Sequence, residues 1–439
     1  MEEGRTAHPD NGINRLVRSL LLAGYDLFLS LFLLLGFPFL WRRIRPDKYC
    51  SASPLERFGR YRSLRRSAQK RVWIHAVSVG ELRAVAGLID ALLKERPGEV
   101  LLSVTTRTGR LVASRLFPSL PCVFFPVDIG FVMGRALSLI NPRIVIIVET
   151  ELWPNLLSEA RRRDVPVVIV NGRVSPASYR WYVRFSPFLR RFLPLLSAAV
   201  MRTDEEASRL VRIGACAERV SVGGSMKFDE AASLARRVDP AKLRKKLGIG
   251  EDRPVIVFGS VHPGEEEGVV EICERLVRRF PNLLSLIAPR WLEKTDISRR
   301  LRTRGTAFAL YTRLPHRIDA PVIVVDTYGE LSSLYAVCEV AFVGGSLVQG
   351  GGQNPIEPAA FGRPVLAGPF IWHFAEEWEC LLAGGGAMQV KSFSHLEEAL
   401  CALLSNHPLR RELGKKAAET VSRHTGATEK TLRTIRKFL

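Results

Sequence analysis

From residue 72 onward, short apolar runs alternate along the chain with longer amphipathic runs. The short runs are rich in Val, Ile and Leu, which is typical of strands buried on both faces. The longer runs carry apolar residues at helical spacing. Strands that alternate with helices predict βαβ units and a parallel sheet covered by helices on both faces.

The alternation forms two series, separated by a charged, alanine-rich segment at 228–253 that reads as a linker with one helix. Strands are expected at 72–77, 100–105, 122–125, 144–148, 165–170, 198–201 and 220–222, and then at 255–258, 284–287, 322–324, 340–343 and 365–367. Helices are expected at 81–94, 108–116, 156–163, 204–213, 265–280, 331–338, 356–361 and 376–382. Each series is typical of one Rossmann-like domain, so the sequence predicts an α/β protein with two such domains.

These series suggest the domain organisation. We expect an N-terminal membrane anchor over 1–48, a first Rossmann-like domain over 49–229, a linker over 230–253, a second Rossmann-like domain over 254–425 and a basic helix over 426–439. Open α/β sheets bind ligands beyond the carboxyl ends of their strands. Two such domains that face each other would enclose a cleft.

The segment 20–41 is the most apolar stretch of the chain, with 17 of its 22 residues apolar. At about 1.5 Å per residue it reaches roughly 33 Å, enough to cross a bilayer core. Asp26 and Pro38 weaken this interpretation, and a helix that lies in the membrane interface is an alternative. A cleaved signal peptide is a further alternative, although arginines rather than a small-residue cleavage site follow the segment.

Charge sharpens the membrane prediction, because the chain carries 64 basic and 44 acidic residues and a net charge of +20. Residues 42–71 hold eleven basic and two acidic residues, which by the positive-inside rule places 42–439 in the cytoplasm. In 179–196, arginines alternate with aromatic and apolar residues. This pattern suits anionic lipid head groups, or else solvated arginines over an ordinary core helix. No nucleic-acid-binding motif accompanies the charge.

Composition excludes several classes of protein. The apolar fraction of 47% is that of a globular chain, and seven scattered cysteines without a CxxC pair disfavour a disulfide scaffold or a zinc site. The chain lacks HExxH and GxSxG, so metal and serine hydrolysis have no support. Neither domain opens with GxGxxG, which excludes an NAD-linked oxidoreductase.

Three motifs of the first series follow predicted strands and carry candidate chemistry: HAVSVGE, ETELWPN and GGSMKFD. Glu81 is a candidate general base or a helix-stabilising first-turn residue; the helix dipole would lower its pKa, so a base would need burial. Glu149 and Glu151 alternate in direction, so we expect at most one to point into the cleft, or both to serve capping around Trp153. Lys227 is a candidate cation for an anionic substrate, or a solvated lysine.

The second series carries GSVHPGEE, Pro289–Arg290, DTYGEL and GGSLVQGGGQNPIEP at strand ends. The turn before the first helix is a ready anion site, although three glutamates at 265–267 would repel a polyphosphate. Asn354 is expected as an N-cap, with Pro355 at N1 and Glu357 at N3. Glu357 is therefore either a capping residue or an acceptor for two ribose hydroxyls, and both roles are compatible.

Seven motifs in this order, including APR and GGQNPIEPAAFGRPV, are highly specific. The chain resembles the 3-deoxy-D-manno-octulosonic acid (Kdo) transferases of Gram-negative lipopolysaccharide synthesis, from the anchor to about residue 430. The resemblance implies a GT-B glycosyltransferase of the inner membrane that transfers Kdo from CMP-Kdo to the lipid A precursor, lipid IVA, with inversion. The runner-up interpretations are a GT-B transferase with another nucleotide sugar, such as a heptosyltransferase, and an inactive lipid-binding relative.

The resemblance also assigns roles to residues. Glu81 would be the general base, and Glu151 and Lys227 would stabilise the transition state. The CMP site would comprise Pro289, Arg290, Tyr328, Gly329, Glu330, Asn354, Pro355, Ile356 and Glu357. Because CMP is already a good leaving group, no cofactor and no obligatory metal are expected. The sequence departs from the family pattern at Arg107, Gln353, Phe370 and His373.

Overall fold

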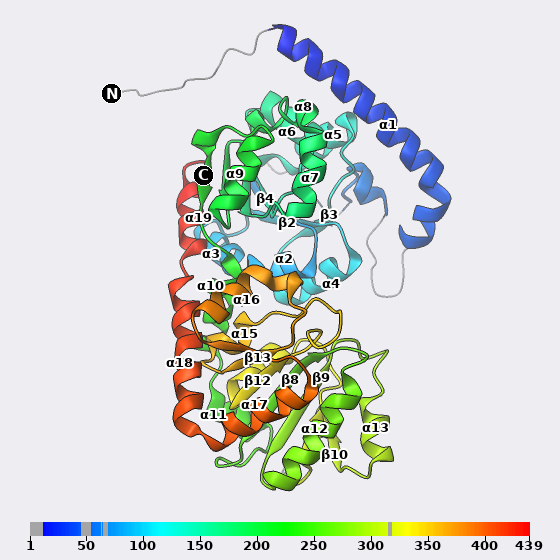
Figure 1. Cartoon of the computed structure of the whole chain (residues 1–439). Coiled ribbons are helices and arrows are strands. Elements are labelled where there is room, and N and C mark those ends of the chain that lie inside the picture. The colour runs from blue at the N-terminus through cyan, green and yellow to red at the C-terminus, as the bar shows by residue number, and fades with distance from the viewer. Residues whose placement is uncertain (1–11, 45–53, 63, 65–68, 315–317) are drawn as a thin grey trace. The chain divides into compact units, whose positions relative to one another are not determined.

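The computed structural model describes residues 12–44, 54–62, 64, 69–314 and 318–439. They form two compact units, Met1–Met226 with Gly426–Leu439 and Lys227–Thr425, which we name unit 1 and unit 2. Each unit is built on one seven-stranded sheet whose neighbouring strands are all parallel. The predicted α/β architecture with two parallel sheets is therefore confirmed (Figure 1).

The sheet of unit 1 has the order β3-β2-β1-β4-β5-β6-β7. Its strands are β1 (Arg71–Ala76), β2 (Val100–Val104), β3 (Cys122–Phe124), β4 (Pro142–Val148), β5 (Val167–Gly172), β6 (Ala198–Met201) and β7 (Val220–Val222). Alternate residues of β1 face opposite cores, since Ile74 packs in one hydrophobic cluster and Trp73 in the other. Seven strands were predicted for this unit and seven are present among the described residues.

Helices cover both faces of this sheet. One face carries α2 (Val79–Ala84), α3 (Ala86–Glu95), α4 (Arg107–Leu116) and α19 (Ala427–Arg436). The other carries α5 (Gly130–Ile140), α6 (Pro154–Arg162), α7 (Pro176–Arg184), α8 (Ser186–Leu189) and α9 (Asp204–Arg212). The helix predicted at 81–94 is broken at Val85, whose backbone is not helical, so α2 is a separate turn that presents Glu81.

The sheet of unit 2 has the order β10-β11-β9-β8-β12-β13-β14. Its strands are β8 (Val255–Val261), β9 (Leu284–Pro289), β10 (Phe308–Leu310), β11 (Val322–Val324), β12 (Val340–Val343), β13 (Val365–Ala367) and β14 (Ala387–Gln389). The prediction missed β10 and β14, which are three-residue edge strands too short to show a period.

The helices of unit 2 pack on both faces of its sheet. They are α10 (Met226–Arg237), α11 (Pro240–Lys246), α12 (Glu266–Arg279), α13 (Ile297–Thr303), α14 (Leu331–Leu334), α15 (Ile356–Ala360), α16 (Ala375–Ala383), α17 (Phe393–Ser405) and α18 (His407–Arg423). The segment 228–253, expected to hold one helix, holds α11 and most of α10 because Val238 and Asp239 interrupt a longer run.

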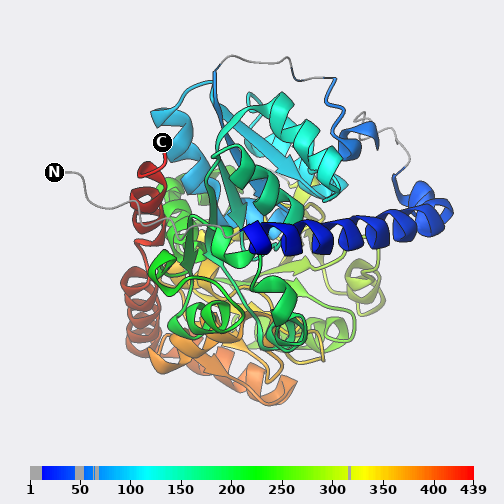
Figure 2. The same ribbon diagram turned by 90° about the horizontal axis from the view of Figure 1, so that it is seen from above.

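The apolar segment forms α1 (Gly12–Ile44), a single 33-residue helix drawn in blue in Figure 1. Within it, Leu16–Gly36 is long and apolar enough to cross a membrane. Seen from above in Figure 2, the second half of α1 runs clear of the neighbouring ribbons of unit 1. Its exposed apolar residues include Leu27, Phe28, Leu31, Phe32, Leu34 and Leu35.

Candidate active site

The carboxyl edge of the unit 1 sheet gathers three glutamates. Strands β1 and β4 are neighbours, and Glu81 follows the first while Glu149 and Glu151 follow the second. The backbone at this edge is unusual, because Glu149 and Asn171 adopt left-handed φ angles of 60° and 51°. Such conformations are uncommon for residues with a Cβ and cluster at functional sites.

Glu81 and Ser78 cap the start of α2 in an arrangement related to the capping box. The Ser78 hydroxyl accepts from the Glu81 N–H at 3.3 Å, while the Glu81 carboxylate accepts from the Val77 N–H at 2.7 Å and from the Ser78 hydroxyl at 2.9 Å. Burial nevertheless raises the pKa of Glu81 to about 7; the Val77 N–H lowers it, and the Glu149 and Glu151 charges raise it. The burial that a base requires is present, so capping and proton transfer are compatible.

The expectation that at most one of Glu149 and Glu151 points into the site rested on strand alternation, and this premise is wrong. Strand β4 ends at Val148, and the left-handed Glu149 breaks the two-residue period. The charges of both residues raise the pKa of Glu81. Burial, followed by the Glu149 charge, likewise raises the pKa of Glu151. Three carboxylates thus share one partly dehydrated edge.

The loop that carries Glu151 is fastened at several points. The Arg173 N–H donates to the Thr150 hydroxyl at 3.0 Å, and the Tyr182 hydroxyl donates to the Thr150 carbonyl at 3.4 Å. The Trp153 ring lies 5.5 Å from the Phe125 ring. These contacts hold the backbone of 149–153 against α7 and the sheet.

Asp128 supports the loop that carries Glu151 by capping α6, a role that was not predicted from the sequence. Its fully buried carboxylate accepts from the backbone N–H groups of Asn155 (3.0 Å) and Leu156 (2.9 Å), and so caps α6. Burial raises the pKa of Asp128 to about 7. The available signal was Pro154 at the helix start after Trp153, a residue that cannot cap, which requires an acceptor from elsewhere in the chain.

His75 opens the first motif but is a core residue. It is fully buried, stacks on Phe125 with ring centroids 3.8 Å apart, and its Nδ1 contacts Ser103 at 3.1 Å. Burial lowers the pKa of His75 to about 3, so it is neutral at physiological pH. No group of three or more His, Cys, Asp or Glu side chains in the described residues could hold a metal ion.

Lys227 lies in α10 of unit 2 and is held by that unit. Its Nζ donates to the buried Glu377 carboxylate at 2.9 Å and lies 4.6 Å from the centre of the Phe374 ring. The interpretation as a solvated lysine is therefore wrong, because only 18% of its side chain is exposed. A fixed and partly buried cation can still attract an anion, although Glu377 offsets part of its charge.

In unit 2, one of the protein's own carboxylates, from the residue just before α12, takes up backbone N–H groups of the turn after β8 and of the loop after β12. Glu265 is fully buried and accepts from the N–H groups of His262 (3.0 Å), Gly345 (2.7 Å), Ser346 (3.0 Å) and Leu347 (2.9 Å). It joins the turn after β8 to the glycine-rich loop after β12. This side chain fastens the carboxyl edge of the sheet and leaves those N–H groups no room for a phosphate.

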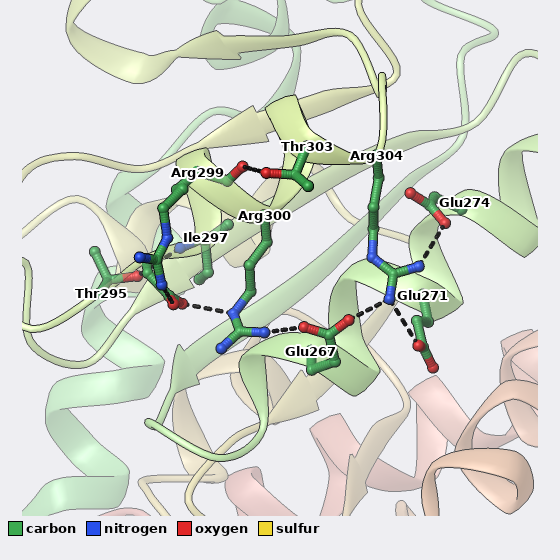
Figure 3. Close-up of polar contacts among 10 residues, drawn as sticks. Glu267, Glu271, Glu274, Thr295, Ile297, Arg299, Arg300, Thr303 and Arg304 are labelled. Atoms are coloured by element: carbon green, nitrogen blue, oxygen red, sulfur yellow. Dashed lines mark hydrogen bonds and ion pairs between the residues drawn. The ribbon is translucent and has the colours of Figure 1, made fainter.

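The other two glutamates of this run also have partners. Glu266 accepts from the Thr295 hydroxyl at 2.7 Å, and Glu267 pairs with Arg300 and Arg304 of α13. Figure 3 shows the ion pairs of Glu267, in which Arg304 reaches Glu271 and Glu274 as well. Each of the three glutamates thus has its own partners within the protein. The expectation that all three would repel a polyphosphate is not supported.

The predicted N-cap at Asn354 is shifted by one residue. Helix α15 begins at Ile356 after Pro355, yet the Asn354 side chain does accept from the Ile356 N–H at 3.1 Å. The Glu357 carboxylate accepts from the Asn354 amide (3.1 Å) and from the Ser332 hydroxyl (2.7 Å) instead of closing a capping box. Each of its oxygens keeps a further lone pair for a ligand hydroxyl.

The remaining predicted ligands lie at the carboxyl ends of β9 and β11. Pro289 ends β9, and the exposed Arg290 follows it and donates its backbone N–H to the Val261 carbonyl at 2.8 Å. Tyr328 is 60% exposed, and its hydroxyl accepts from the Leu292 N–H (2.9 Å) and donates to the Glu293 carboxylate (2.7 Å). Gly329 has a left-handed φ of 102°, and the Glu330 carboxylate accepts from the Tyr311 hydroxyl at 3.4 Å. The exposed guanidinium of Arg290 suits an anion.

The departures from the family pattern have local roles. The Gln353 carbonyl accepts from the Trp378 indole at 3.3 Å, and the His373 N–H donates to the Gly351 carbonyl at 2.8 Å. A Cβ on Gly351 would come within 2.5 Å of the His373 ring, so the ring lies directly over this glycine. Arg107 begins α4, and Phe370 donates its N–H to the Ser346 carbonyl at 3.0 Å. Gln353, Phe370 and His373 brace the glycine-rich loop of unit 2, whereas Arg107 lies in unit 1.

Two doubly wound parallel sheets with motifs at their carboxyl edges define a glycosyltransferase-like fold of the GT-B type. The fold is similar to that of UDP-GlcNAc 2-epimerase from Neisseria meningitidis, with a TM-score of 0.59 at 14% identity over 84% of this chain and all of that one.

The family follows from the sequence comparisons. Residues 53–230 match the family model described as 3-deoxy-D-manno-octulosonic-acid transferase (kdotransferase). The chain is 31% identical to 3-deoxy-D-manno-octulosonic acid transferase from Haemophilus influenzae over 88% of its own length and 91% of the relative's. It is 35% identical to that of Bordetella pertussis, over 84% and 87%. The chain belongs to the Kdo transferase family and is a glycosyltransferase.

Proposed function

We propose that this chain transfers Kdo from CMP-Kdo to the lipid A precursor, lipid IVA, with inversion at the anomeric carbon. The observation that carries the proposal is the carboxyl edge of unit 1, where burial raises the pKa of Glu81 to about 7 beside Glu149 and Glu151. A general base acts best when its pKa lies near the working pH. Family membership supports the sugar, and the proposed donor follows from it.

In the proposed step, Glu81 takes the proton of an acceptor hydroxyl while that oxygen forms a bond to the anomeric carbon of Kdo. The bond from this carbon to the phosphate oxygen breaks, and its electron pair leaves with CMP. A single displacement inverts the configuration. Glu151 would stabilise positive charge that develops on the sugar, as carboxylates do in glycoside chemistry. Lys227 would offset negative charge on the departing phosphate.

The carboxyl edge of unit 2 is the proposed CMP site. Arg290 can pair with the phosphate, and Tyr328–Glu330 and Asn354–Glu357 surround the place where the nucleoside would lie. The free lone pairs of Glu357 suit the two ribose hydroxyls. We propose that the reaction needs no metal, because a good leaving group and fixed cations suffice.

We also propose that the chain works at the cytoplasmic face of the inner membrane. Exposed Trp181, Val183 and Phe185 of α7 and its C-terminal end accompany Arg180 and Arg184 and present an aromatic, basic surface. The apolar α1 supports membrane attachment. Much of the basic segment 42–71 lies outside the described residues.

Mass spectrometry tests the function. Detergent-solubilised full-length protein is incubated with lipid A precursor and freshly generated CMP-Kdo, in parallel with Glu81→Gln. The wild type is expected to add one or more Kdo masses, and the variant none. Protection of the wild type against thermal unfolding by CMP, but not by UDP or ADP, distinguishes this donor from other nucleotide sugars. Absence of product from folded, CMP-binding wild type would contradict the proposal.

A further inference from the structure

The apolar helix α1 contains one acidic residue, Asp26, near its middle. An ionisable side chain in such a helix is costly unless it has partners, and its presence indicates a function. Here the carboxylate accepts from the backbone N–H of Gly130 at 3.1 Å and from the Asn155 side-chain amide at 2.7 Å. Asp26 therefore binds the first turns of both α5 and α6.

The surfaces around this contact fit one another. A Cβ on Gly130 would lie 3.0 Å from the Asp26 carboxylate and 3.3 Å from the Asn155 side chain, so a glycine permits the close approach. Leu21 and Leu22 pack against the hydrophobic core on this face of the sheet, and Tyr25 lies 6.1 Å from the Phe188 ring of α8. The first half of α1 is thus seated on unit 1.

Asn155 connects the Asp26 contact to the loop 149–153. Its side-chain amide also donates to the Asp128 carbonyl, and its backbone N–H donates to the Asp128 carboxylate. Asn155 directly follows Pro154 and lies four residues after Glu151. One amide therefore connects the apolar helix, the cap of α6 and the end of the loop 149–153.

The contact between Tyr182 and Thr150, which holds the start of the loop 149–153, is also connected to α1. Tyr182 of α7 holds the Thr150 carbonyl, and α8, which contacts Tyr25 through Phe188, follows α7 after one residue. Both the start and the end of the loop are consequently braced by elements on which α1 rests. Removal of the Asp26 contact would loosen the loop without changing any group that touches substrate.

We propose that Asp26 is a positioning residue, which through Asn155 couples the seating of the apolar helix on unit 1 to the placement of Glu151. The inference rests on the proposed role of Glu151 in transfer. It assigns α1 a part in catalysis in addition to membrane attachment. Displacement of a catalytic group by about 1 Å can lower a rate by about 100-fold, so a loosened loop is expected to lower kcat by about tenfold.

Asp26→Leu, Asp26→Asn and Ser30→Leu separate positioning from attachment. Asp26→Leu makes the helix more apolar and preserves membrane binding, but it removes the acceptor. Ser30→Leu adds similar apolar surface at an exposed position of the same helix. Asp26→Asn retains one acceptor oxygen for partial rescue. Full-length variants are compared for kcat, for KM of CMP-Kdo and for cosedimentation with anionic phospholipid vesicles.

Amide hydrogen exchange of 149–156 is measured in the same samples and requires no activity. We expect Asp26→Leu to lower kcat about tenfold and to leave KM within about twofold of the wild-type value. The variant should bind vesicles as the wild type does, and its amides at 149–156 should exchange faster. Wild-type exchange at 149–156 in Asp26→Leu would overturn the inference, whether or not vesicle binding and activity fall. If wild type transfers no Kdo, the proposed function fails, while the exchange result still decides the coupling.

A double-mutant cycle with Asp26→Ala and Asn155→Ala identifies the path. If both residues act through their shared contact, the increase in exchange at 149–156 in the double variant is smaller than the sum of the increases in the two single variants. Additive effects of the two substitutions would overturn the relay through Asn155.

Discussion

The carboxyl edges of the two sheets use the same residue type in opposite ways. In unit 1, Glu81, Glu149 and Glu151 gather with like charges, and burial raises the pKa of Glu81 to about 7. In unit 2, Glu265 receives four backbone N–H groups and Glu267 two arginines. Partly buried carboxylates that lie among like charges can exchange protons near neutral pH, whereas a carboxylate that accepts four N–H groups or pairs with two arginines fastens loops. This contrast supports the proposal that the general base of the reaction lies in unit 1.

The largest expected effect comes from Glu81→Gln. We expect kcat to fall by about 10³-fold, because the acceptor hydroxyl loses its base. The fold should persist, since the amide oxygen can accept from the Val77 N–H and the amide nitrogen can donate to Ser78. Kinetics and thermal unfolding check both parts. If Glu81→Gln retained its activity, Glu81 would not be the general base.

For Glu265→Gln, in contrast to Glu81→Gln, we expect a loss of stability. Its amide nitrogen would face N–H groups that now donate to an oxygen, so we expect a loss of about 3 kcal/mol in the free energy of unfolding. Denaturant unfolding of the full chain measures this. Glu267→Gln is the matched control, and its exposed ion pairs should contribute less than about 1 kcal/mol. Equal effects of the two substitutions would contradict the fastening role.

Arg290→Ala should weaken the binding of an anionic donor. Loss of one charged contact to a phosphate is expected to raise KM for CMP-Kdo about tenfold, with little change in stability at this exposed position. Arg290→Lys should recover part of the loss, because the charge remains without the planar fork. An unchanged KM would place the phosphate elsewhere.

The smallest effect is expected at the edge of the α12–α13 network. Glu271→Gln removes an exposed partner of Arg304 while Glu267 and Glu274 remain. We expect a change below about 0.5 kcal/mol in the free energy of unfolding. A larger change would show that the ion pairs of this network stabilise one another. The expected contribution of other ion pairs of unit 2 to the free energy of unfolding would then need the same revision.

The sequence predicted the features that are local in the chain. Two series of apolar runs predicted both parallel sheets, and strand–turn–helix punctuation placed Glu81, Glu151 and Glu357 at strand ends. Contacts between distant residues were not predictable, as with Asp26 and Asn155, 129 residues apart, or Glu265 and Gly345, 80 apart. The alternation of Glu149 and Glu151 failed because the left-handed backbone at Glu149 has no signature in hydrophobic periodicity.

The pH dependence of kcat/KM tests the central claim most directly. The acidic limb reports the pKa of the base in the free enzyme. We predict a limb near pH 7 in the wild type, because Glu81 must lose its proton to act. In Glu149→Gln the limb should move to lower pH, since removal of a negative charge favours ionised Glu81. A wild-type limb near the ordinary carboxyl pKa of about 4.3, or one that Glu149→Gln leaves unmoved, would contradict the account.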